Sequence, residues 1–91
     1  MCVVSNQMKI VYTRHVLRKQ EILKELGWDI YLKLIEETIR KPQFTSKNKR
    51  GQLTAISLLN KEHILRVVYE VRDDIIVVIT FHVSRKGRYG T

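Results

Sequence analysis

The sequence predicts a single α+β domain, in which two N-terminal helices pack on an antiparallel β-sheet of about three to four strands. Ninety-one residues suffice for one domain but not for two. Apolar residues recur at helical spacing before residue 40, whereas runs rich in Val, Ile and Thr follow residue 50. Helices followed by consecutive strands are typical of α+β folds. We expect a helical part at about 13–41, a basic loop at 41–52, a β-meander at about 53–85 and a basic tail at 85–91.

The first helix is predicted at 13–26, after a short strand-like segment at 8–12. Thr13 is a residue type that caps helix N-termini, and Gly27 favours a helix end. At 100° per residue, His15 falls inside the apolar arc of this helix and Arg18 lies on its edge. The arc comprises Tyr12, His15, Val16, Ile22, Leu23 and Leu26. His15 is therefore either a hydrogen-bonded core residue or a catalytic group turned toward the sheet.

A second helix is predicted at 29–40, because its apolar residues again share one stripe. Pro42 disfavours a helical conformation at Lys41 and ends this helix. The stripe comprises Trp28, Tyr31, Leu32, Ile35 and Ile39.

Three strands are predicted at 53–59, 64–71 and 75–84, separated by turn-like residues. If 72–74 form a three-residue loop, Val67 lies opposite Ile79 and all facing pairs on that side are apolar. A two-residue loop would mix the two faces and is disfavoured. On the other face this register places Arg66 opposite Thr80 and Ile64 opposite His82.

Charge points to a polyanionic partner. Seventeen Lys and Arg against nine Asp and Glu give a net charge of +8. The excess is clustered, since 40–50 and 82–91 contain no acidic residue, and nucleic acid is the usual partner of such a surface.

The single Cys2 and three scattered histidines make no metal site, and no cofactor motif is present. Without a leader or an apolar stretch of membrane-spanning length, the chain is expected to be cytoplasmic and not membrane-bound.

The polar face of the last hairpin supplies the candidate site. His82 and His15 are candidates for proton transfer near neutral pH, Arg66 for holding a phosphate, and Tyr89 for stacking on a base. The same residue types also occur on ordinary solvated sheet faces. The expected nucleic-acid contacts are Arg18, Lys41, Lys47, Lys49, Arg50, Thr80, Ser84, Arg85, Lys86 and Arg88.

Several short motifs resemble a known family. These are Ile10-Val-Tyr-Thr-Arg-His15, Arg40-Lys-Pro42, Leu65-Arg-Val-Val-Tyr69 and Val78-Ile-Thr80. Together they resemble domain of unknown function 4258 and, more distantly, RelE-like toxins of the barnase–EndoU–colicin–RelE fold. The similarity extends over roughly residues 9–89.

The resemblance implies helices on an antiparallel sheet and, in the wider group, metal-independent RNA cleavage with the 2′-hydroxyl as nucleophile. His15 matches the leading histidine of the family and Thr80 its late-strand threonine. His82, Ser84, Arg85 and Tyr89 fall where related toxins often place polar active-site groups.

Three functions follow as hypotheses. The first is a small RNA-directed domain, specifically a toxin-type endoribonuclease with an antitoxin or a second copy as possible partner. The second is a non-catalytic nucleic-acid-binding module, in which the histidines are structural. The third is a protein-interaction domain whose exposed sheet edge pairs with another chain.

Overall fold

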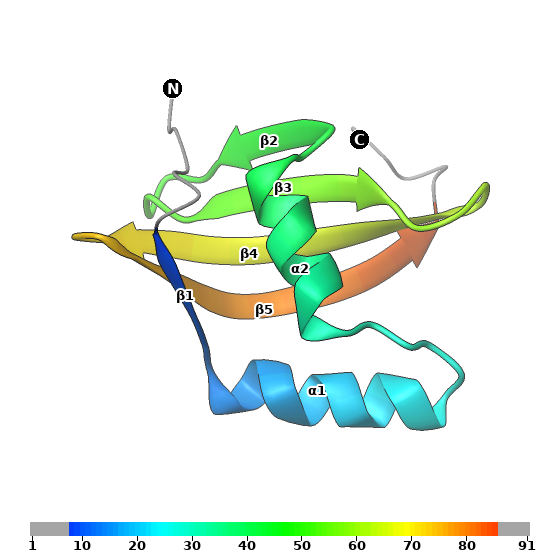
Figure 1. The fold of residues 1–91 in the computed structure, drawn as a ribbon. Coiled ribbons are helices and arrows are strands. Elements are labelled where there is room, and N and C mark those ends of the chain that lie inside the picture. Colours follow the sequence, from blue (N-terminus) through cyan, green and yellow to red (C-terminus); the bar gives the residue numbers. More distant parts are fainter. Residues whose placement is uncertain (1–7, 86–91) are drawn as a thin grey trace.

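The computed structural model describes residues 8–85 of the chain. One strand comes first, two helices follow, and four strands complete the domain (Figure 1). The elements are β1 (Lys9–Tyr12), α1 (Arg14–Glu25), α2 (Leu32–Arg40), β2 (Phe44–Lys47), β3 (Leu53–Leu58), β4 (His63–Arg72) and β5 (Ile75–Arg85).

The strands form one sheet in the order β1-β5-β4-β3-β2. β1 pairs with β5 in parallel, and the other neighbours are antiparallel. The predicted α+β class, the two helices and the β3–β5 meander are confirmed. The predicted strand number was too low, because β1 joins the sheet and β2 lies within the segment predicted to be a loop. β2 is an edge strand of sequence Phe-Thr-Ser-Lys whose four residues are all exposed, and it lacks the apolar alternation that marks a half-buried strand.

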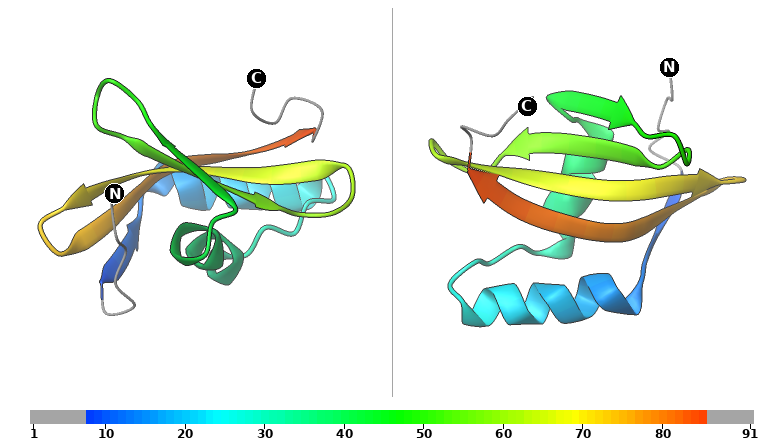
Figure 2. Two further views of the ribbon diagram at one scale, coloured as in Figure 1. Left: turned by 90° about the horizontal axis from the view of Figure 1, so that it is seen from above. Right: turned by 180° about the vertical axis from the view of Figure 1, so that it is seen from behind.

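The two helices contact the sheet in different ways. α2 crosses one face, which we call the core face, whereas α1 lies along the edge of β5 (Figures 1 and 2). Neither helix of the described part is long and apolar enough to cross a membrane. The core face of β3, β4 and β5 packs with α2 and one residue of α1 to form the main hydrophobic core.

The edge position of α1 changes which of its residues are buried. Val16 is fully buried, but Ile22 and Leu26 are 51% and 70% exposed. His15 is also exposed, so its predicted place in an apolar, core-facing arc was wrong. A helix beside a sheet edge buries a narrower stripe than a helix lying across the face.

α2 begins at Leu32 and not at residue 29 as predicted. The preceding residues 28–31 form no regular secondary structure, and the N–H of Ile30 donates to the carbonyl of Trp28 at 3.2 Å. Trp28 and Ile30 both pack against the core, and Ile30 is 2% exposed. Burial of these two side chains outweighs the capping preference of Asp29.

The predicted β4–β5 register was wrong. The turn has two residues, Asp73 and Asp74, so that Arg72 pairs with Ile75. Asp73 has φ 55°, a left-handed conformation that aspartate tolerates better than most residues.

A β-bulge then reverses the alternation of β5. The register shifts between Val68, which pairs with Thr80, and Tyr69, which pairs with Val78, leaving Ile79 as the extra residue. Before the bulge the even-numbered residues of β5 face the core, and after it the odd-numbered ones do. The buried residues follow this change, since Ile76, Val78 and Phe81 are all fully buried.

Because of the bulge, the cross-strand pairs on the opposite face of the sheet, which we call the far face, also differ from the predicted ones. Arg66 lies opposite His82, not Thr80, and Ile64 lies opposite Ser84. The run Ile75–Ile79 is apolar throughout, so either alternation buries apolar residues. Sequence pattern alone therefore could not choose between the two registers.

Candidate nucleic-acid interface

Thr13 joins β1, α1 and the bulge of β5. Its backbone N–H donates to the carbonyl of Val78 at 3.4 Å, and its hydroxyl donates to the carbonyl of Ile79 at 3.3 Å. The same hydroxyl oxygen accepts a hydrogen bond from the backbone N–H of Val16 and caps α1, as predicted. One residue thus ends the pairing of β1, begins the helix and fixes both to the bulge.

Beyond this joint, α1 runs in the same direction as β5 (Figure 1). Nε2 of His15 lies 3.0 Å from Oγ1 of Thr80, and Nζ of Lys19 lies 2.7 Å from Nδ1 of His82. Four helical residues rise about 6 Å, and two strand residues rise about 6.6 Å. These two rises are nearly equal. Side chains four residues apart on α1 therefore lie beside side chains two residues apart on the far face of β5.

Arg66 completes this group of side chains. It pairs with His82 across the β4–β5 ladder, which places both side chains on the far face. Nε of Arg66 is buried and has no hydrogen-bond partner among the described residues. A buried donor without a partner is costly. We call His15, Lys19, Arg66, Thr80 and His82 the His82 cluster.

Neighbouring positive charge disfavours protonation of His82. Its pKa is lowered from 6.5, first by burial and then by the charges of Lys19, Arg66 and His15. The pKa of Lys19 is also lowered, by burial, from a much higher ordinary value. Lys19 is therefore the ammonium donor of the pair and Nδ1 of His82 is the acceptor. The proton of the neutral ring then resides on Nε2.

The lowered pKa of His82 has a consequence for stability. Between the folded pKa and the unfolded value near 6.5, the unfolded chain binds more protons than the folded chain. This group therefore contributes less stability as the pH falls through that window. The cluster is a compact positive site in which a bound anion would reduce the repulsion between like charges.

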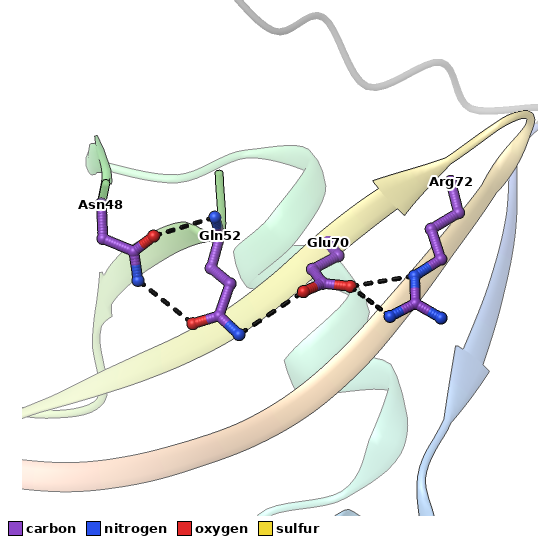
Figure 3. Close-up of polar contacts among 4 residues, drawn as sticks. All are labelled: Asn48, Gln52, Glu70 and Arg72. Atoms are coloured by element: carbon purple, nitrogen blue, oxygen red, sulfur yellow. Dashed lines mark hydrogen bonds and ion pairs between the residues drawn. The ribbon is translucent and has the colours of Figure 1, made fainter. Parts of the chain in front are cut away.

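The other end of the far face carries a neutralised network (Figure 3). Nε and Nη2 of Arg72 both donate to Oε2 of Glu70, at 2.9 and 2.6 Å. Gln52 donates to Oε1 of Glu70 at 3.4 Å, and Asn48 donates to Gln52 at 3.1 Å. The hydrogen bond from Arg72 is the main reason that the pKa of Glu70 is lowered. Arg72 is thus paired with an acid, whereas the cations of the His82 cluster have no acidic partner among the described residues.

The structure brings together only part of the predicted site. His15, His82, Arg66 and Thr80 share the His82 cluster, so both histidines lie on one side of the sheet. Ser84 and Arg85 follow at the end of β5 and line an adjoining groove with Lys19 and His82. Tyr89, Lys86 and Arg88 lie outside the described residues.

The other predicted nucleic-acid contacts lie elsewhere. Lys47, Lys49 and Arg50 belong to the β2–β3 hairpin, which turns at the opposite end of the sheet from the end of β5 (Figure 1). Lys41 caps α2 on the core side, and Arg18 is exposed on α1. The predicted basic loop is therefore not part of the His82 cluster, because β3 and β4 separate β2 from β5.

Lys19 is the cluster residue that the sequence reasoning missed. It follows His15 by four residues, which is the spacing that places two side chains on one helix face. That spacing could have identified Lys19 as a neighbour of His15 on the helix. The missing information was that α1 lies beside β5, which depends on tertiary packing.

The described residues contain no group of three or more His, Cys, Asp or Glu side chains placed to hold a metal ion. No protein-family model, curated protein or solved structure matches the chain. The resemblance to domain of unknown function 4258 and to RelE-like toxins stays a prediction. We therefore infer the function from the geometry and charge of the site.

We expect the pKa of His82 to lie below 6.5 and to rise in Lys19→Gln. The substitution removes one positive charge beside the ring, while burial still holds the pKa down. NMR titration of the histidine rings measures both values. Lys24→Gln is the matched control, because Lys24 is exposed on the same helix. An unchanged pKa in Lys19→Gln would contradict the proposed pairing.

Proposed function

We propose that this chain binds RNA by holding a backbone phosphate in the His82 cluster, and that it cleaves RNA there without a metal ion. The observation that carries the proposal is the convergence of Lys19, Arg66 and His82 on one sheet face, with no acidic partner among the described residues. Guanidinium and ammonium groups are the usual ligands of RNA phosphates.

The electrostatics of His82 support anion binding. In the free chain the pKa of His82 is lowered by burial and by the nearby cations, which disfavours the charged ring. A phosphate would compensate the charges of those cations and accept a hydrogen bond from the Nε2–H of His82. Binding and protonation of His82 are thereby coupled, so each favours the other.

Cleavage through the 2′-hydroxyl needs a base and an acid, and the two histidines supply them in this proposal. Neutral His15 accepts the 2′-hydroxyl proton on the ring nitrogen not bonded to Thr80. The 2′-oxygen then forms a bond to phosphorus as the bond from phosphorus to the 5′-oxygen breaks. Once the phosphate is bound, His82 takes up a proton at Nδ1, which releases the hydrogen bond from Lys19, and the charged ring donates its Nε2 proton to that leaving oxygen. Lys19 and Arg66 stabilise the added negative charge.

Binding should depend on salt. Lys19 and Arg66 neutralise one phosphate in this proposal and Arg85 a second, so affinity for single-stranded RNA should fall about 7-fold between 50 and 200 mM salt. Arg66→Gln should weaken binding and reduce the slope of log affinity against log salt. Fluorescence anisotropy with a labelled oligonucleotide measures both effects.

Lys33→Gln is the matched control for charge, since Lys33 is exposed on α2 over the core face. It should leave affinity and slope nearly unchanged. Equal losses in Arg66→Gln and Lys33→Gln would indicate non-specific attraction to a basic protein. Absence of binding at low salt would refute the RNA proposal and favour a protein-interaction domain.

Cleavage is tested by incubating the chain with single-stranded RNA in EDTA, after refolding from denaturant to remove any co-purified inhibitor. We expect products with 2′,3′-cyclic phosphate and 5′-hydroxyl ends. His82→Ala and His15→Ala should each lower the rate about 10²–10⁴-fold while circular dichroism remains native. If the chain binds RNA but leaves it intact, the proposed cleavage is refuted and the chain is a non-catalytic nucleic-acid-binding module.

A further inference from the structure

A groove adjoins the His82 cluster at the end of β5. It encloses about 330 Å³, which is at the small end of the range for ligand sites. Lys19 and His82 form its border with the cluster, so a ligand in the groove would touch the same two residues as the phosphate. Its lining residues are Lys19, Leu23, Trp28, His63, His82, Val83, Ser84 and Arg85. We call it the Trp28 groove.

Two aromatic rings form one side of this groove. Trp28, in the connection between α1 and α2, meets His63, the first residue of β4, edge to face with ring centroids 4.8 Å apart. Both side chains are partly buried, and Trp28 packs against the hydrophobic core. The indole is thus held in place by packing while part of its surface faces the groove. Aromatic groups fixed in this way are the usual stacking platforms for unpaired bases.

The rest of the lining is polar and cationic. Ser84 follows His82 by two residues on the far face of β5, and the exposed Arg85 ends the strand. A hydroxyl and a guanidinium can hydrogen-bond to the polar edge of a base. Leu23 supplies an apolar contact one helical turn after Lys19. The groove therefore combines an aromatic wall, a polar edge and a cationic border.

We infer that the Trp28 groove binds one unpaired nucleobase of the RNA whose phosphate occupies the His82 cluster. This inference rests on the proposed function and extends it from the phosphate to the base. The volume suits one nucleoside, and the shared residues Lys19 and His82 place the base next to its own phosphate. The substrate is therefore single-stranded RNA, because a paired base is stacked within the helix and cannot enter the groove.

The test uses Trp28, which is the sole tryptophan of the chain, as a reporter. A single-stranded oligoribonucleotide is compared with an abasic oligonucleotide of the same length and charge. The intact oligonucleotide should change Trp28 emission and bind at least about 5-fold more tightly, because each stacked base contributes about 1 kcal/mol or more. His63→Ala should reduce the difference in affinity between the two oligonucleotides without weakening the binding of the abasic one. Tyr31→Ala, which truncates an exposed aromatic residue outside the groove, is the matched control.

The outcomes separate the groove from the phosphate site. Equal affinity for both oligonucleotides with unchanged Trp28 emission would refute base binding in the Trp28 groove, while the His82 cluster would remain the proposed phosphate site. Failure of both oligonucleotides to bind at low salt would refute the proposed function and the groove together. Tighter binding of the intact oligonucleotide that is insensitive to His63→Ala, with unchanged Trp28 emission, would place base recognition elsewhere and also overturn the groove.

Discussion

The hydrogen bonds of Thr13 to the bulged part of β5 are the constraint on which the site depends. Thr13 bonds to the carbonyls of Val78 and Ile79 and caps α1 with the same side chain. Without the bulge, the alternation that buries Ile76 and Val78 would continue and place Thr80 and His82 in the core. A buried histidine without a hydrogen-bond partner would be costly. The bulge instead turns the buried Phe81 and the half-buried Val83 toward the core, and presents Thr80, His82 and Ser84 on the far face beside α1.

The sequence predicted the parts of the fold that local patterns determine. Thr13 as an N-cap, two helices and three strands after residue 50 all follow from capping chemistry and apolar periodicity. The register was not predictable, because Ile75–Ile79 is apolar on both faces. The position of α1 beside β5 was not predictable either, since the exposed Ile22 and Leu26 form a better amphipathic stripe than the residues that actually meet the sheet.

The candidate site was predictable to the extent that its residues lie on β5. Thr80, His82 and Ser84 alternate with Phe81 and Val83, and that pattern identifies a polar strand face at one end of the chain. Lys19 was missed because its contact with His82 depends on α1 lying beside β5, where the rise of four helical residues nearly equals that of two strand residues. The separation of the basic loop from the His82 cluster was not predictable, because charge density in the sequence does not indicate at which end of the sheet the charge lies.

Charge is distributed unequally along the far face. At one end Glu70 neutralises Arg72 and receives a hydrogen bond from Gln52, so that end offers little attraction to an anion. At the other end burial and the charges of Lys19 and Arg66 lower the pKa of His82. Placing like charges together reduces stability, and such arrangements are found where a ligand compensates them.

The most direct test of this account is the pKa of His82 with and without bound single-stranded RNA, followed by NMR of the histidine rings. If a phosphate occupies the His82 cluster, the pKa must rise on binding, because the anion favours the imidazolium form. RNA bound with the pKa of His82 unchanged or lower would contradict the assignment of the cluster as the phosphate site.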